Sequence, residues 1–565
     1  MMPHMIVAES HDVVTASPAP RDRRLAAILL TLGFCLTVVC GRVHPDGLVH
    51  FDDLTHYLFA RWAWTWPTYL LNDWGRPGFT IPYFLPAALG WPACKVLSAI
   101  VHAAAAWLAY GIAGRLGIRY AWAVIPLCYA QPLFFNLAQT TLTESPMALY
   151  VTASVYLALR ARWGGSAAVM SLAFITRHEA VILALPWAWC AWRAGVPLRR
   201  SWPLLWAPAA VNLAAIAAGV QPAIELLFAP RASTQYGRGG WLTFLCRSLE
   251  AFGPGVMVLA IAGLAPLWRN RAARLTLGVA LTYFLAHTAI RALGLYASGG
   301  YARFLVPIAP LVAIAALAGW NRLFDADAAE RRRCAVALVA GMIILDASLE
   351  RQFEIHERLH DILAEYPQVD QARTAMRWAT GLFLAACATA VIVDRKAHHA
   401  EPRVSGGGPR AGFAVRAPAL LVIALIALTA WKLAGPIRPP PEAPIVRDTL
   451  AWLREAGHGE REIISANVWI DYVTRRNLPP DRPSVREALA AAPIGALFAW
   501  ENQFAASEDH RLPLSDFVDH PSWRLIHQSA PRPGAKAPYL LIFQKISVWP
   551  QPTPATSVAP AQPRP

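Results

Sequence analysis

Two adjacent acids follow the first apolar segment of this 565-residue chain, in the stretch FDDLTHYLFARW at residues 51–62. Asp52 and His56 lie four residues apart, as do Asp53 and Tyr57, so a helix that begins near Asp52 places carboxylates, an imidazole and a phenol on adjacent faces. Neighbouring carboxylates repel each other, which raises the pKa of one, and such a group can take a proton from a reacting hydroxyl. Acids in a first helical turn also cap the helix and oppose its dipole. The pair is therefore a candidate catalytic site, with capping as the alternative.

Tryptophans surround the end of this helix, which Pro67 is expected to close. Tryptophan side chains favour the headgroup layer of a bilayer, where the ring has one apolar and one wet end. We therefore predict that the loop lies along a membrane surface and holds its acids at the depth of a lipid phosphate. The tryptophans that carry this prediction are Trp62, Trp64, Trp66 and Trp74.

Four basic side chains are predicted at helix ends on the same side of the membrane as Asp52: Arg76, Arg177, His178 and Arg303. Arginine offers paired donors to phosphate oxygens, and a departing phosphate needs cations to receive its charge. Arginines at helix ends also serve as membrane anchors. Phosphate binding and membrane anchoring therefore both remain open for these side chains. For Arg76 a further alternative is a plain loop charge, and for His178 it is a structural role.

Glu144 ends the stretch TLTE, which is the pattern of a capping box at the start of a helix, with Pro146 in its first turn. Capping explains this acid fully. Its predicted place in the second outer loop makes contact with a substrate or a metal ion the alternative.

The elements that must position these groups are membrane helices. The chain is 56% hydrophobic and 15% charged, which is too apolar for a water-exposed surface. Runs of about 20 apolar residues span a bilayer as helices, the form that satisfies the backbone in lipid. We expect a mainly α, polytopic transmembrane bundle of about 13 helices. The spans are placed near 25–40, 92–113, 120–138, 144–160, 165–177, 180–194, 202–220, 254–268, 275–292, 303–320, 333–349, 374–393 and 414–434.

Basic residues gather at every second helix boundary, which predicts a cytoplasmic N-terminus and a first outer loop at residues 41–78. The formal net charge of +15 could suggest a nucleic acid, but its alternating placement is typical of a membrane protein, so no nucleic-acid partner is expected. We expect a multi-pass protein of a bacterial inner or plasma membrane.

The chain divides into four parts by composition. Residues 1–24 are predicted as a disordered cytoplasmic N-terminus and residues 25–435 as the transmembrane domain. Residues 443–546, after a proline-rich spacer, mix a helical pattern with short β-like runs and predict a small extracytoplasmic α/β domain. Residues 550–565 are predicted to be disordered.

The order of these motifs resembles the GT-C superfamily of membrane glycosyltransferases that use polyprenyl-phosphate sugars, including protein O-mannosyltransferase-like and aminoarabinose-transferase-like enzymes. The resemblance rests on the acidic pair, on WGRPGFTIPYF at 74–84, QTTLTESPMALY at 139–150 and LAFITRHEAVILALP at 172–186, and on the RFLVPIAP run that begins at Arg303. It covers roughly residues 25–435. The family's acidic pair is commonly Asp-Glu with an aromatic about three residues on, so Asp52, Asp53 and Tyr57 depart in the second acid and in the spacing.

The resemblance implies a membrane glycosyltransferase that moves a mannose-like or other hexose or pentose from a polyprenyl-phosphate carrier to a hydroxyl of a lipid, glycan or protein. It implies inversion, with Asp52 or Asp53 as the base, and substrate contacts from Tyr57, Arg76, Glu144, Arg177, His178 and Arg303. It implies no certain cofactor, and a divalent cation is left open. The alternative is a transporter or non-catalytic assembly subunit for lipid-linked saccharides.

Overall fold

The computed structural model describes residues 20–228, 238–296, 298–324, 378, 381, 385, 422–424, 426–431, 434–502, 504–507 and 510–549. The chain forms two compact units. Residues Met1–Val43 and Leu70–Ile437 make the first, called here the membrane unit, and residues His44–Tyr69 and Arg438–Pro565 make the second, called the terminal unit. The expected span at 333–349, nearly all of the span at 374–393, most of the span at 414–434, residues 1–19 and the expected disordered tail at 550–565 lie outside the described residues. Residues 20–24, which were expected to be disordered, instead belong to the helix Pro20–Val43.

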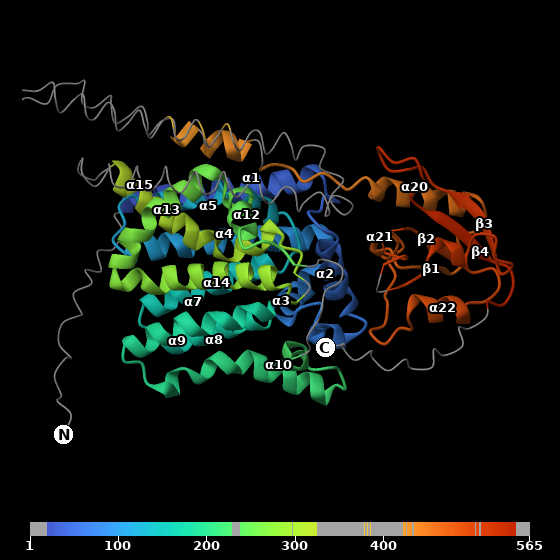
Figure 1. The fold of residues 1–565 in the computed structure, drawn as a ribbon, viewed down its shortest axis with the longest axis horizontal. Coiled ribbons are helices and arrows are strands. Elements are labelled where there is room, and N and C mark those ends of the chain that lie inside the picture. The colour runs from blue at the N-terminus through green and yellow to red at the C-terminus, as the bar shows by residue number, and fades with distance from the viewer. Residues whose placement is uncertain are drawn as a thin grey trace, which may run out of the picture. The chain divides into compact units, whose positions relative to one another are not determined.

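The membrane unit is helical throughout its described residues (Figure 1). Its α-helices are α1 (Pro20–Val43), α3 (Pro77–Ala88), α4 (Trp91–Arg115), α5 (Val124–Tyr129), α6 (Pro132–Leu137), α7 (Glu144–Leu159), α8 (Trp163–Phe174), α9 (Ala184–Arg193), α10 (Trp206–Ala217), α11 (Ala223–Phe228), α12 (Thr243–Phe252), α13 (Pro254–Arg269), α14 (Arg274–Leu293) and α15 (Ala309–Phe324). Six 3-10 helices join them: η2 (Ala121–Ala123), η3 (His178–Leu183), η4 (Leu198–Arg200), η5 (Trp202–Leu205), η6 (Arg271–Ala273) and η7 (Ala302–Ile308). Helix α7 packs against α4 and α8, and α13 against α15.

Four helical stretches among the described residues are long and apolar enough to cross a membrane: Pro20–Val43, Trp91–Arg115, Arg271–Leu293 and Ala302–Leu323. A fifth crossing is possible if α12 and α13, which meet at 113°, count as one bent span. The chain is therefore an integral membrane protein, as the sequence predicts. The expected total of about 13 spans stays a prediction.

Several expected spans are shorter or broken in the structure. The continuous helix expected at 120–138 is wrong, because this stretch forms η2, α5 and α6. Gln131 takes an extended backbone before Pro132, and steric contact with a following proline disfavours the helical region for such a residue. The spans expected at 180–194 and 202–220 likewise begin as 3-10 turns, at η3 and η5, before they become the α-helices α9 and α10.

The contact between α13 and α15 depends on two glycines. A Cβ atom added at Gly263 would lie 1.9 Å from the carbonyl oxygen of Ala315, and one added at Gly319 would lie 1.8 Å from that of Leu259. Backbone atoms cannot move aside as a flexible side chain can, so the two helices approach closely only because neither position has a side chain.

We therefore expect Gly263→Ala to destabilise the protein by about 2–3 kcal/mol, since it forces the two helices apart. Thermal unfolding in detergent measures the effect. Gly114→Ala in α4 is the matched control, because an added Cβ there meets nothing within 4 Å, and it should leave stability unchanged or slightly raised. Equal melting temperatures for the two variants would contradict the close packing.

The terminal unit contains a four-stranded sheet in the order β1-β2-β4-β3 (Figure 1). Its strands are β1 (Ile463–Ser465), β2 (Leu497–Trp500), β3 (Trp523–Gln528) and β4 (Leu541–Lys545), and its helices are α2 (Phe51–Trp62), η1 (Pro67–Leu71), α20 (Glu442–Glu455), α21 (Val468–Val473), α22 (Val485–Ala491) and η8 (Leu514–Asp516). Strand β1 runs parallel to β2, and β4 pairs antiparallel with β2 and β3. Every residue of β2 is buried, which explains its continuous apolar run.

Candidate active site

The acidic pair lies in the first turn of α2, as the spacing predicts. The helix is capped by a residue that the sequence reasoning did not consider. His50 has an extended backbone, and its Nδ1 accepts a hydrogen bond from the backbone N–H of Asp52 at 3.2 Å. The capping alternative therefore does not account for both acids, because the cap itself is supplied by the histidine.

The two acids have different surroundings. The side chain of Asp52 is 23% exposed, and its Oδ2 lies 3.2 Å from Nδ1 of His50. Asp53 is fully buried, and His56, three residues further along the same helix, is 6% exposed. A reacting hydroxyl can reach a carboxylate only where some of it is open to the surroundings, so the accessible acid of the pair is Asp52.

Helix α2 is held by residues from the distant C-terminal part of the terminal unit. Nη2 of Arg61 and Nε1 of Trp62 both donate to the carbonyl oxygen of Arg476, at 2.6 Å each. Tyr57, predicted as a substrate contact, is 4% exposed, and its ring meets that of Tyr472 edge to face with centroids 6.1 Å apart. These contacts fix the orientation of the helix that carries the acids.

The loop that precedes α2 is tied to the same region. Asp46 accepts a hydrogen bond from the hydroxyl of Tyr472 at 3.3 Å and forms an ion pair with Arg447. The expectation that all four tryptophans lie in the headgroup layer is wrong for Trp62. Its side chain is 2% exposed and packs in the interior of the protein. Trp64, Trp66 and Trp74 are exposed and remain candidates for that layer.

A buried acid on α21 lies beside the carbonyl that anchors α2. Burial raises the pKa of Asp471 to about 6, although Arg476, Arg482 and Arg61 each act to lower it. The closest of these, Arg476, places Nη1 3.6 Å from Oδ1 of Asp471. The buried carboxylate is therefore only partly compensated by its neighbours.

This raised pKa predicts a stability that falls as the pH rises. Below about pH 4 the carboxyl is neutral in both the folded and unfolded states, whereas above pH 6 the folded state alone bears the cost of a buried charge, about 3 kcal/mol. Asp471→Asn should remove this loss. Hydrogen exchange of α21, corrected for the intrinsic rate at each pH, measures it, and an equal pH dependence in the variant and the parent would contradict the assignment.

In the membrane unit, five of the predicted site residues come together in two groups. The first group is centred on Glu144, which is 1% exposed. Nη1 of Arg177 lies 2.8 Å from Oε1 of Glu144, and Nε of Arg303 lies 3.7 Å from the same oxygen. Nε of Arg177 also donates to Oε1 of Glu179 at 2.5 Å. Burial of a charge is costly unless the charge is paired, and this carboxylate has two guanidinium partners.

Local breaks in helical structure put these side chains in place. The capping box predicted from Thr141 to Glu144 is wrong, because Glu144 is the first residue of α7 and the N-cap is Thr143, which forms no side-chain cap. Arg177 has an extended backbone between α8 and η3, and Arg303 lies in η7. Each charge therefore projects from a chain segment where a helix starts or stops.

Aromatic rings support the guanidinium groups. Cζ of Arg177 lies 4.5 Å from the centroid of the Phe304 ring. Arg303 lies over the rings of Tyr301 and Phe304, at 5.1 and 5.4 Å. Contacts of this kind attract a cation and hold the plane of the guanidinium fixed.

The second group joins Arg76 to His178. Nη1 of Arg76 lies 2.9 Å from Nε2 of His178, and the same Nε2 lies 2.7 Å from Oδ1 of Asp73. Arg76 has a positive φ of 61°, a conformation that is unusual for a side chain other than glycine, and it begins α3. All three side chains are between 16% and 22% exposed, so a ligand can reach them.

Sequence reasoning missed several members of these groups. Asp73 and His287 were not considered, although His287 lies within 3.6 Å of Glu179 and a lone imidazole inside an apolar helix is a signal that could have identified it. No group of three or more His, Cys, Asp or Glu residues that could hold a metal ion occurs in the part of the chain that the structure describes.

Comparison with known proteins identifies the fold. No family model matches the sequence, and no curated protein matches it. The chain is similar to the crystal structure of ArnT from Cupriavidus metallidurans in the apo state, with 14% sequence identity and a TM-score of 0.54, over 93% of this chain and 98% of that one. It is also similar to ArnT from the same organism bound to undecaprenyl phosphate, with 14% identity and a TM-score of 0.50, over 94% and 99%. The chain therefore has the fold of these ArnT structures, which agrees with the fold expected from the order of its sequence motifs.

Proposed function

We propose that this protein is a membrane glycosyltransferase that moves a hexose or pentose from a polyprenyl-phosphate carrier to a hydroxyl acceptor, with inversion at the anomeric carbon. The observation that carries the proposal is the partly exposed carboxylate of Asp52 at the start of α2, beside the fully buried Asp53, in a chain with the GT-C fold. That one ArnT structure is bound to undecaprenyl phosphate supports a polyprenyl phosphate as the carrier.

The proposed reaction needs one base and no general acid. The carboxylate of Asp52 takes the proton of the acceptor hydroxyl as its oxygen attacks the anomeric carbon. The bond between that carbon and the phosphate oxygen breaks, and the electron pair leaves with the polyprenyl phosphate. Because the phosphate leaves as a stable anion, cations that receive its charge replace a proton donor.

Arg303 and Arg76 are the proposed ligands of the carrier phosphate. Arg177 has short contacts to both Glu144 and Glu179, so its charge is already compensated and its proposed role is to position the group. Arg303 lies farther from Glu144, at 3.7 Å, and Arg76 is 22% exposed. His178 holds Arg76, and Glu144 orients Arg303, so these two contribute through their partners.

The proposed setting is the outer face of a bacterial inner membrane, with the N-terminus in the cytoplasm and the α/β part of the terminal unit outside. The acceptor is a lipid, glycan or protein hydroxyl, and the residues of β1–β4 and α20–α22 would orient it. A mannose-like sugar remains the donor suggested by the sequence resemblance.

Membranes that contain the double variant Asp52→Asn, Asp53→Asn test the proposal against a panel of radiolabelled polyprenyl-phosphate sugars. We expect transfer by the parent with at least one donor and none above background by the variant. Full transfer by the double variant would exclude the assignment.

The same panel separates the enzyme from the alternative of a transporter or assembly subunit. The purified parent protein should transfer label on its own. Retention of labelled carrier without any transfer, under conditions in which the double variant behaves identically, would favour the non-catalytic alternative.

A further inference from the structure

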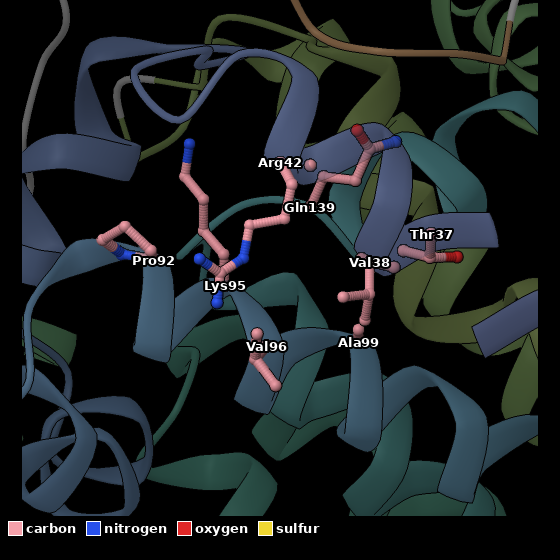
Figure 2. A pocket seen from close by; sticks show the side chains of 10 residues that line it. Thr37, Val38, Arg42, Pro92, Lys95, Val96, Ala99 and Gln139 are labelled. Atoms are coloured by element: carbon pink, nitrogen blue, oxygen red, sulfur yellow. The ribbon is translucent and has the colours of Figure 1, made fainter. Parts of the chain in front are cut away.

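A groove between α1 and α4 is lined by none of the residues of the proposed reaction. Its walls include Val38 and Arg42 from α1 and Lys95, Val96 and Ala99 from α4, all of which Figure 2 shows. Two of the ten lining residues are cationic and none of them is acidic. The groove is therefore lined by apolar side chains together with two cationic ones.

Arg42 and Lys95 each lie near one end of a helix that is long enough to span the membrane. Arg42 is in the last turn of α1, Lys95 is in the second turn of α4, and the two helices are both long and apolar enough to cross a bilayer. Because the same groove includes both side chains, the end of α1 and the start of α4 must lie at the same membrane face. Cations at this depth meet the phosphate layer of the lipid.

Lys95 does not behave as an ordinary anchor. A lysine at a helix end normally extends its ammonium group into water. Lys95 is instead 6% exposed, and its Nζ lies 3.9 Å from the centroid of the Trp91 ring. The indole of Trp91 is itself fixed by a 2.8 Å hydrogen bond to Oγ1 of Thr141. The ammonium group is thus held in a built position within the wall of the groove.

Gln139 supplies an independent sign of a ligand. Its Nε2 donates to the carbonyl oxygens of Phe135 and Gly435, at 3.5 and 3.0 Å, which fixes the orientation of the amide. Its Oε1 is fully buried and has no hydrogen-bond partner among the described residues, in a side chain that is only 2% exposed and lines the groove. A buried acceptor in this state costs free energy unless something donates to it.

We propose that this groove is a binding site for an anionic phospholipid whose head group carries hydroxyls, of the phosphatidylglycerol type. Arg42 and Lys95 hold the phosphate, a head-group hydroxyl donates to Oε1 of Gln139, and an acyl chain lies over Val38, Val96 and Ala99. The site is separate from Glu144, Arg177 and Arg303, and its existence does not depend on the proposed reaction.

Native mass spectrometry of the full chain tests the proposal, after extraction from nanodiscs of phosphatidylcholine that contain a minor fraction of phosphatidylglycerol or of phosphatidic acid. The parent should retain one phosphatidylglycerol molecule in preference to phosphatidic acid and phosphatidylcholine. Arg42→Gln should weaken retention about fivefold, and Arg42→Gln with Lys95→Met about thirtyfold. Excess inorganic phosphate should not displace the lipid.

Arg115→Gln is the matched control, because this arginine lies in the last turn of α4 at the opposite end of the same helix. It should leave retention unchanged. Equal losses from Arg115→Gln and Arg42→Gln would show that the lipid responds to charge in general and would overturn the site. Arg42 is exposed at a helix end, so its single variant keeps the fold and decides the matter even if the Lys95 variant is unstable. Equal retention of phosphatidic acid would overturn the hydroxyl contact of Gln139.

Discussion

Asp52→Asn is expected to lower kcat for sugar transfer by at least about a hundredfold, with little change in KM for the carrier sugar. Asparagine has nearly the same shape as aspartate but cannot accept the acceptor's proton. The backbone N–H of Asp52 still donates to His50, so α2 keeps its cap. Initial rates with a labelled polyprenyl-phosphate sugar measure the effect.

Two further variants make this prediction specific. Asp448→Asn replaces an exposed acid on α20 and should leave kcat unchanged. Asp53→Asn affects the fully buried partner and is expected to act on stability more than on the pH dependence of kcat. If instead the Asp53 variant alone lost transfer while the Asp52 variant kept it, the roles of the two acids would have to be exchanged.

The second large effect is expected from Glu144→Ala, which should destabilise the protein by about 3–5 kcal/mol. Removal of this carboxylate leaves the guanidinium groups of Arg177 and Arg303 with less compensation in a position where water does not replace it. Thermal unfolding in detergent reports the loss directly.

Glu250→Ala is the control for the buried pair, since Glu250 is 46% exposed and solvent can replace its contact with Arg247, three residues earlier in α12. Its expected effect is below about 1 kcal/mol. A comparable loss of stability in both variants would indicate that burial of Glu144 has no special energetic weight. Glu144→Gln, which keeps the shape of the side chain, should lie between them.

The local features of the site could be predicted from the sequence because they depend on neighbours in the chain. The helix at Asp52 follows from spacing, and its acids lie in the first turn as their preference for a helix N-terminus predicts. The apolar spans near residues 25–40, 92–113, 275–292 and 303–320 follow from composition alone. The fold of the chain was predicted from the order of its sequence motifs, although each motif is degenerate by itself.

The features that the sequence could not predict are the long-range pairings. A hydrophobic run indicates where a helix lies, but it does not indicate which charged side chain of another segment contacts that helix. The contact of Glu144 with Arg177 was therefore not predicted. The sequence offered a helix cap or a substrate or metal contact for Glu144, and its ion pair with Arg177 could not be predicted without knowing that distant partner. The breaks at Gln131 and Arg177 depend on proline and on tertiary contacts that override helical propensity.

The bonds from Arg61 and Trp62 to the carbonyl of Arg476 have a consequence for biosynthesis. Arg61 and Trp62 precede Arg476 in the chain by 415 and 414 positions. At about 5–20 residues per second, a ribosome needs roughly 20–80 seconds to supply Arg476 after it has made α2. During that interval Tyr57 and Trp62 lack the residues that cover them in the finished protein. We therefore expect the nascent loop to bind a chaperone or the membrane surface during this interval. In a chain that terminates before residue 476, the helix that carries the two acids would lack these stabilising contacts.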